Sequence, residues 1–299
     1  MTPNTNWTFD QYERVRDILP SADFPKTSQH INNLGDLADQ IDVFLLDAFG
    51  VLNIGERTVP TAPARVAELQ AAGKQVFVLT NGAGAPTEKS VEKYQNLGYD
   101  FDAHHVISSR AALIVALEQR SEVNWGVMAA SFSRLDTLPN SCHPLLDDPA
   151  EYDNADAFAL ISARGWSENR QALLVESLKK NPRPVLVGNP DIIAPQIGKF
   201  SLEPGWFAYE LARATGIQPE FYGKPFNNVF DIALSRVDPS IPRNRIAMVG
   251  DTLHTDVLGG AAQGLQTVLI TDHGLFAGHN VADYIEKSGI IPNWIAKDT

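Results

Sequence analysis

The sequence contains one cysteine, Cys142, among its 299 residues, so the chain cannot form an internal disulfide. Such scarcity of cysteine is typical of proteins from a reducing compartment. No apolar run approaches the ~20 residues that a bilayer-spanning helix needs. The first ten residues have neither the basic start nor the apolar centre of a signal peptide. We therefore expect a cytoplasmic protein that has no contact with a membrane.

Positive charge is also in short supply. Lys and Arg number 24 against 36 Asp and Glu, which gives a formal net charge of −12. Proteins hold nucleic acids with clustered Lys and Arg side chains, and this chain has no such cluster. The composition argues against a nucleic-acid partner. A small anionic metabolite stays compatible with it, provided that the binding site is locally positive or filled by a metal ion.

The chain does contain uninterrupted apolar runs that end in polar residues. Residues 43–46 form the first run, which ends at Asp47 and is followed by Ala48, Phe49 and Gly50. A run without alternation predicts a strand that is buried on both faces, as in a parallel sheet. Ligands of such sheets bind outside the carboxyl ends of the strands, so Asp47 is a candidate for chemistry. A strand-ending Asp that merely forms a turn is the alternative for this residue alone.

Strands and helices alternate along most of the sequence, which predicts an α/β fold with a Rossmann-like parallel-sheet core. Residues 1–116 and 218–299 are expected to form this core, with residues 1–40 as an N-terminal arm that has a helical pattern at 12–19. Residues 117–217 contain further strands and helices of their own. We expect them to form an α/β domain that is inserted into the core as a lid.

Polar residues at the ends of the core strands form one constellation. It consists of Asp47, of Thr80 and Asn81 after the run 76–79, of Lys224, and of Asp251 and Asp256 after the run 246–249. Carboxylates that converge at one sheet edge repel each other and favour a hard divalent cation, for which Mg²⁺ is the usual choice. A hydroxyl, main-chain N–H groups and a lysine opposite that cation suit a phosphoryl group.

The order and spacing of these residues resemble the haloacid dehalogenase superfamily, and most closely its class IIA, the NagD-like and 4-nitrophenylphosphatase-like enzymes. The matching motifs follow in the order of that class: LTNG (79–82), GNPD (188–191), PG (204–205), TG (215–216), YGKP (222–225) and VGDTLHTD (249–256). Each motif is weak alone, but six in order are specific. The resemblance implies a C2-type cap between the Thr and Lys motifs. It also implies a homodimer that pairs through the caps.

The resemblance further implies a role for each matching residue. Asp47 is expected to be the nucleophile that forms an aspartyl-phosphate, and Lys224 and Thr80 are expected to assist it. The expected magnesium ligands are the carboxylates of Asp47 and Asp251 and the main-chain carbonyl of Phe49, with Asp256 held behind them. The expected phosphate- and substrate-binding residues are Thr80, Asn81, Gly82, Lys224, Asn189 and Asp191.

Phe49 departs from the pattern of the phosphatases in this superfamily, which carry a second Asp at this position. That Asp protonates the leaving oxygen and then activates water, and such help is worth about 10²–10⁴-fold in rate. We therefore expect a slow or selective phosphatase, unless another residue such as His254 or Asp191 takes over this task. A solvated loop residue is the commoner role for a histidine like His254.

Two other functions stay open. The protein could use its phosphate and metal site for binding or regulation, because Phe49 removes efficient turnover. It could also be a metal-independent dehalogenase-like hydrolase, since the segment Asp-Ala-Phe-Gly resembles the first motif of the 2-haloacid dehalogenases. Asp251 and Asp256 argue against the latter, because two more acids beside Asp47 are costly without a cation.

Overall fold

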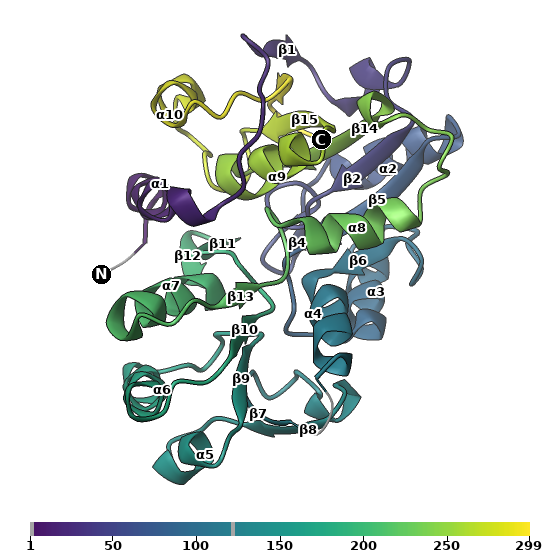
Figure 1. The fold of residues 1–299 in the computed structure, drawn as a ribbon. Coiled ribbons are helices and arrows are strands. Elements are labelled where there is room, and N and C mark those ends of the chain that lie inside the picture. Colours follow the sequence, from purple (N-terminus) through teal and green to yellow (C-terminus); the bar gives the residue numbers. More distant parts are fainter. Residues whose placement is uncertain (1–2, 121–122) are drawn as a thin grey trace.

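The computed structural model describes residues 3–120 and 123–299, so residues 1–2 of the expected arm and 121–122 of the expected lid lie outside it. Its larger sheet has seven strands, all parallel (Figure 1). In spatial order they are β1 (Gln29–Ile31), β16 (Trp294–Ala296), β15 (Gln266–Ile270), β14 (Ile246–Gly250), β2 (Val43–Leu46), β5 (Gln75–Thr80) and β6 (Val106–Ser108). We call the domain around this sheet the core.

Strand β2 lies between β14 and β5 in the interior of the sheet and is buried on both faces, which confirms the prediction from its uninterrupted apolar run. Phe44 and Leu46 pack in one hydrophobic cluster and Val43 and Leu45 in another on the opposite face. Helices α2 (Ala62–Ala71) and α3 (Thr87–Asn96) contribute to the first cluster, and α4 (Ser109–Glu118) and α8 (Asn227–Ser235) to the second. The predicted parallel-sheet core is thus confirmed.

A second parallel sheet of five strands lies beside the core, and we call its domain the cap (Figure 1). Its strands are, in spatial order, β13 (Glu220–Phe221), β10 (Val185–Val187), β9 (Ala157–Leu160), β7 (Asn124–Met128) and β8 (Ser141–Pro144). Its helices are α5 (Pro149–Asp153), α6 (Glu168–Lys180) and α7 (Pro204–Thr215). The sequence assigned residues 220–221 to the core, whereas β13 pairs with β10 of the cap sheet. A two-residue strand carries too little local pattern to specify its partner.

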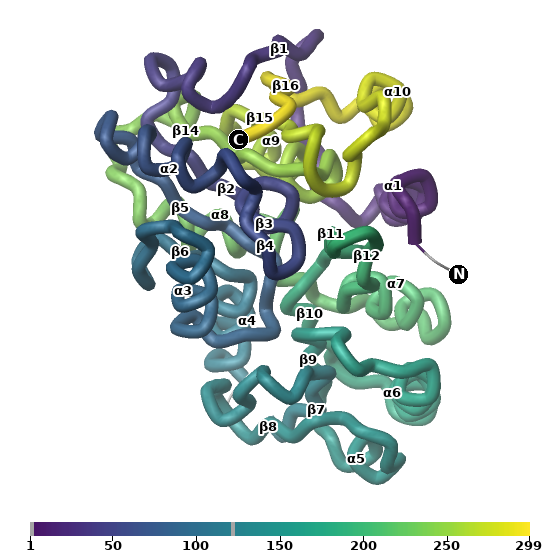
Figure 2. Tube along the Cα trace, turned by 180° about the vertical axis from the view of Figure 1, so that it is seen from behind, coloured from purple at the N-terminus to yellow at the C-terminus, as the bar shows by residue number. Residues whose placement is uncertain are grey.

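Two antiparallel hairpins meet between the domains. The cap contributes β11 (Ile193–Gln196) and β12 (Lys199–Leu202), and the core contributes β3 (Asn53–Ile54) and β4 (Arg57–Thr58). Figure 2 shows the core hairpin beside β11 of the cap hairpin. A Cβ placed on Gly55, at the turn of the core hairpin, would lie 3.2 Å from Oε1 of Gln196. The cap hairpin therefore rests directly on the core beside the carboxyl end of β2.

The N-terminal arm connects cap and core a second time. Its helix α1 spans Thr5–Arg14 with Asn4 as cap, followed by a 3₁₀ turn at Arg16–Ile18. The hydroxyl of Thr5 donates to the carbonyl of Leu275 in the core at 2.8 Å. The hydroxyl of Tyr12 accepts a hydrogen bond from the main-chain N–H of Ile192 in the cap at 3.1 Å. The helix thus begins at Thr5, seven residues before the helical pattern expected at 12–19, because the sequence reasoning overlooked Asn4 as the residue that starts the helix.

The chain ends in the core. Helix α9 (Leu258–Ala262) follows β14, α10 (Val281–Ser288) follows β15, and the tail returns to the large sheet as β16. This pairing places the aromatic tail, for which the sequence offered no position. Within residues 3–120 and 123–299, none of the helices has both the length and the apolar character to cross a membrane.

The contact between Tyr12 and Ile192 leads to a prediction about stability. Tyr12→Phe leaves the buried N–H of Ile192 without its acceptor, so we expect the free energy of unfolding to fall by about 1–3 kcal/mol. Urea unfolding measures this change. Tyr222→Phe is the control, because the Tyr222 hydroxyl bonds to Glu220 in an exposed position and its loss should cost at most about 0.5 kcal/mol. Equal effects of the two substitutions would contradict the bridging role of α1.

Candidate active site

Three strand ends place their polar residues side by side at the edge of the core sheet. Strand β2 lies between β14 and β5, and the main-chain N–H of Asp47 donates to the carbonyl of Val249 at 2.8 Å. Asp47 therefore follows β2 at the level where Asp251 follows β14 and Thr80 ends β5. The structure thus brings together the strand-end residues that the sequence singled out.

Lys224 lies among these residues with a side chain that is only 1% exposed. Its Nζ is 2.6 Å from Oδ1 of Asp47 and 2.7 Å from Oδ1 of Asp256. Asp256 belongs to a π-helical turn, Leu253–Val257, that leads from β14 into α9. Asp47, Asp251 and Asp256 each have a carboxylate oxygen within 4.8 Å of the others. The Lys224 ammonium thus pairs with two of these three clustered acids, and such a set suits a divalent cation.

The charges in this cluster shift one another's pKa. Burial raises the pKa of Asp251 well above its usual value, and Asp256 and Asp47 raise it further. Burial also raises the pKa of Asp256 to about 7, against the opposing effect of the Lys224 ammonium. Burial alone would lower the pKa of Lys224, but Asp256 and Asp47 outweigh it and hold this pKa above its usual value. The site therefore holds an excess of negative charge that a cation would relieve.

Glycines make room for the buried acids. A Cβ on Gly250 would lie 2.0 Å from Cγ of Asp256, and a Cβ on Gly274, where φ is +84°, would lie 1.9 Å from Oδ2 of Asp251. The Asp251 carboxylate accepts hydrogen bonds from the Thr252 hydroxyl and from the Leu275 main-chain N–H, both at 2.8 Å. These bonds fix the orientation of Asp251. Because glycine has no side chain, Gly274 leaves room for the Asp251 carboxylate and Gly250 leaves room for that of Asp256.

Asn81 joins the Lys224 segment to the cap. Its side-chain oxygen accepts from the main-chain N–H of Lys224 at 2.7 Å, and its amide nitrogen donates to the carbonyl of Lys224 at 2.9 Å. The same nitrogen donates to Oδ1 of Asp191 at 2.8 Å. Asn81 was expected to bind phosphate or substrate, and its side chain in addition positions the lysine, which the sequence did not reveal. The short motif TNG gives no sign of a contact so distant in the sequence.

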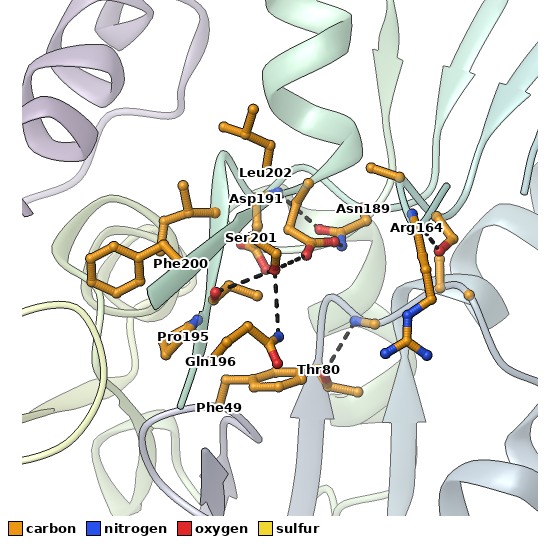
Figure 3. Close-up of a pocket in the computed structure, with 18 of the residues that line it drawn as sticks. Phe49, Thr80, Arg164, Asn189, Asp191, Pro195, Gln196, Phe200, Ser201 and Leu202 are labelled. Carbon is orange, nitrogen blue, oxygen red and sulfur yellow. Dashed lines mark hydrogen bonds between the residues drawn. The ribbon is translucent and has the colours of Figure 1, made fainter. Parts of the chain in front are cut away.

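A cavity of about 690 Å³ opens above the strand ends and is lined by core and cap. Asp47, Phe49, Thr80 and Gly82 line it from the core, and Asn189 and Asp191 line it from the cap. Figure 3 shows Phe49 and Thr80 facing Asn189 and Asp191 across the cavity. Within the described part of the chain, the cavity lining does not include Asn81, Lys224 or Asp256, which lie behind its surface. The expected substrate-facing motif of the cap therefore does face the strand ends.

Several residues of the cavity wall were not found by sequence reasoning. From the core these are Lys93 and Tyr94 of α3, and from the cap Arg164 and Glu203. Asn189 donates to Oε2 of Glu203 at 3.2 Å, and burial raises the pKa of Glu203 to about 7. Helical spacing places Tyr94 on the buried face of α3. No local pattern marks the other three, because the wall forms only when the two domains meet.

Comparisons with known proteins agree with this arrangement. Residues 44–132 match the family described as haloacid dehalogenase-like hydrolase, and residues 221–298 match the family described as HAD-hydrolase-like. The chain is 30% identical over 283 residues to the glycerol-3-phosphate phosphatase of Gallus gallus, which covers 85% of this chain and 88% of that protein. The chain belongs to the haloacid dehalogenase superfamily.

Solved structures show the same fold. A possible sugar phosphatase of the haloacid dehalogenase superfamily from Cytophaga hutchinsonii superposes with a TM-score of 0.77 at 24% identity, over 91% of this chain and 98% of that chain. A glycerol phosphate phosphatase from Mycobacterium tuberculosis, solved in complex with calcium, gives a TM-score of 0.68 at 19% identity, over 88% and 74% of the two chains. These structures show the fold alone. The two family matches and the 30% identical relative confirm the resemblance to class IIA, and the protein is a hydrolase of that class.

His254, which was considered as a replacement acid in this haloacid dehalogenase-like hydrolase, lies elsewhere. Its side chain is fully buried, and its Nε2 lies 2.6 Å from Oε1 of Glu13 in α1. Its ring stacks on Tyr12 with 5.1 Å between the centroids. His254 is therefore neither a pocket residue nor a solvated loop residue, because it anchors the N-terminal arm. Asp191 does line the cavity, and its role as a replacement stays a prediction.

The ion pairs of Lys224 predict how the enzyme responds to metal. Lys224→Met leaves the carboxylates of Asp47 and Asp256 without their ammonium, so we expect the free energy of unfolding in EDTA to fall by about 3–5 kcal/mol. Added Mg²⁺ should then stabilise this variant more than the wild type. Thermal unfolding with EDTA and with Mg²⁺ measures both effects. Lys180→Met serves as the control, since Lys180 pairs with Glu176 on the surface. An unchanged midpoint for Lys224→Met would contradict the account.

Proposed function

We propose that the protein is a Mg²⁺-dependent phosphatase that hydrolyses a small phosphorylated metabolite through an aspartyl-phosphate on Asp47. The observation that carries this proposal is the Lys224 ammonium, 2.6 Å from Asp47 and 2.7 Å from Asp256, beneath a cavity that also presents Thr80. The similarity to a glycerol-3-phosphate phosphatase over most of both chains supports it.

In the proposed reaction an oxygen of Asp47 attacks phosphorus. The new O–P bond forms as the ester O–P bond breaks, and the electron pair leaves with the ester oxygen. The departing oxygen takes up a proton from solvent. Water then attacks phosphorus, the bond between phosphorus and the Asp47 oxygen breaks, and phosphate leaves while the attacking water returns a proton to solvent, which restores the Asp47 carboxylate. Lys224 offsets the charge of the nucleophile and of the phosphoryl group. The Thr80 hydroxyl and the main-chain N–H groups of Asn81 and Gly82 would bind the phosphoryl oxygens.

The carboxylates of Asp47 and Asp251 and the main-chain carbonyl of Phe49 would hold the magnesium ion, with Asp256 orienting this set. The bound ion would supply positive charge to the phosphoryl oxygens. The close set of three carboxylates fits such an ion.

Phe49 favours a second candidate, a protein that binds phosphate and metal but turns over little. A phenyl ring cannot transfer a proton, so leaving groups that need protonation would depart slowly. The hydrolysis of aryl and acyl phosphates would be slowed least, because their leaving groups need little protonation. A metal-independent dehalogenase is less consistent with the site, because Asp251 and Asp256 would add uncompensated charge beside Asp47.

Phosphate release from 4-nitrophenyl phosphate and from a panel of phosphorylated metabolites tests the proposal. We expect release with Mg²⁺ and none in EDTA. Asp47→Asn should abolish release, since the amide oxygen is a far weaker nucleophile. Phe49→Asp should raise release by about 10²-fold or more, since it supplies the missing acid.

Asp42→Asn is the matched control for the first substitution. Asp42 pairs with Lys74 and Arg245 on the core surface, so its variant should keep wild-type turnover. If the wild type releases no phosphate from any substrate yet still binds Mg²⁺, the enzyme proposal fails and the binding function replaces it.

A further inference from the structure

Lys93 of α3 brings a positive charge to the cavity wall directly over Phe49. Its Nζ lies 4.7 Å from the centroid of the Phe49 ring and 5.9 Å from that of Tyr94. The side chain is partly buried and lines the same cavity as Asp47. Within the described part of the chain, no carboxylate lies within 4.0 Å of this ammonium, and no hydrogen-bond acceptor contacts it. Two aromatic faces contact it. Burial lowers the pKa of Lys93, and the charge of Glu56, which also lines the cavity, partly opposes this effect from a longer distance.

Arg164 provides a second such cation on the opposite wall. Its guanidinium carbon lies 5.5 Å from the ring centroid of Phe132, and it too has no carboxylate within 4.0 Å among residues 3–120 and 123–299. In Figure 3 its side chain extends from the cap toward the strand ends of the core. Each wall thus carries one cation that rests on an aromatic ring, and both cations line the cavity.

These cations differ from Lys224, whose charge is already matched by Asp47 and Asp256. An ammonium without a carboxylate partner can bind an incoming anion without breaking an existing ion pair. The apolar ring of Phe49 also keeps water from one side of Lys93, which strengthens its attraction for an anion. The phosphoryl group would sit at Asp47, so the alcohol part of a substrate would extend past Phe49 toward Lys93.

We propose that Lys93, with Arg164 opposite, binds a second anionic group on the alcohol part of the substrate. The substrates would then be phosphate monoesters that also carry a carboxylate or a second phosphate. This inference rests on the proposed phosphatase function. It also assigns a role to Phe49, because an Asp at this position would lie beside Lys93 and compete with the substrate for its charge.

Glycerol 3-phosphate and 3-phosphoglycerate form a matched pair, because they differ only in a hydroxymethyl group against a carboxylate. We expect the wild type to favour the acid in kcat/KM by about 10-fold or more. Lys93→Met should reduce this ratio by about 10- to 100-fold, mainly through the KM of the acid. Lys93→Arg should retain most of the preference. Fructose 6-phosphate against fructose 1,6-bisphosphate is the corresponding pair for a second phosphate.

Lys89→Met is the control variant, because Lys89 lies one turn earlier on α3, is exposed and pairs with Glu92. We expect it to leave the ratio unchanged. A wild type that does not discriminate within either pair would overturn the inference. So would a Lys93→Met variant that loses both members of a pair equally.

Binding separates this inference from the proposed function. Calorimetry with the Asp47→Asn protein measures affinity for both esters without turnover. Tighter binding of the acid, lost when Lys93→Met is added, supports the inference even if no ester is hydrolysed, in which case only the phosphatase proposal fails. Equal affinity for the two esters overturns the inference even if 4-nitrophenyl phosphate is hydrolysed.

Discussion

Lys224 holds its ammonium between the carboxylates of Asp47 and Asp256, at 2.6 and 2.7 Å, with almost no exposure to solvent. A buried charge is costly unless it is paired and hydrogen-bonded, so everything around this lysine has to keep it in place. The two acids reach it from β2 and from the π-helical turn after β14, and the Asn81 side chain binds its main chain from β5. The order of the strands, the π-helical turn and the glycines therefore all help to hold the Lys224 ammonium between these two carboxylates.

That arrangement explains why the cap is tied to the core so closely. Asn81 also contacts Asp191 of the cap, and the residue after Asp191 is bound by Tyr12 of α1. The cap hairpin rests on the core hairpin at Gly55. The cavity between the domains is thus bounded on several sides, which favours small substrates. Its wall combines aromatic rings with the two cations Lys93 and Arg164, while the position of the usual acid holds Phe49.

The sequence predicted the core well because uninterrupted apolar runs such as residues 43–46 alternate with helical segments, a pattern that favours a parallel sheet covered on both faces. It also predicted that Asp47, Thr80 and Asp251 would meet, since the carboxyl ends of parallel strands share one edge. It failed for β13 and β16, which have two and three residues and gain their identity from their partners. It could not predict that His254 lies beneath α1 or that Lys93 lies over Phe49, because both contacts join segments far apart in the chain.

In the proposed reaction Asp47 carries the phosphoryl group, while Phe49 stands where a base would help water to remove it. Rapid mixing with 4-nitrophenyl phosphate and Mg²⁺ tests this most directly, because its leaving group departs without much protonation whereas the second step needs a base. The account predicts a burst of 4-nitrophenol equal to the amount of enzyme, followed by slow turnover, with phosphate located on Asp47 by mass spectrometry after an acid quench. Turnover without a burst and without phosphate on Asp47 would contradict it.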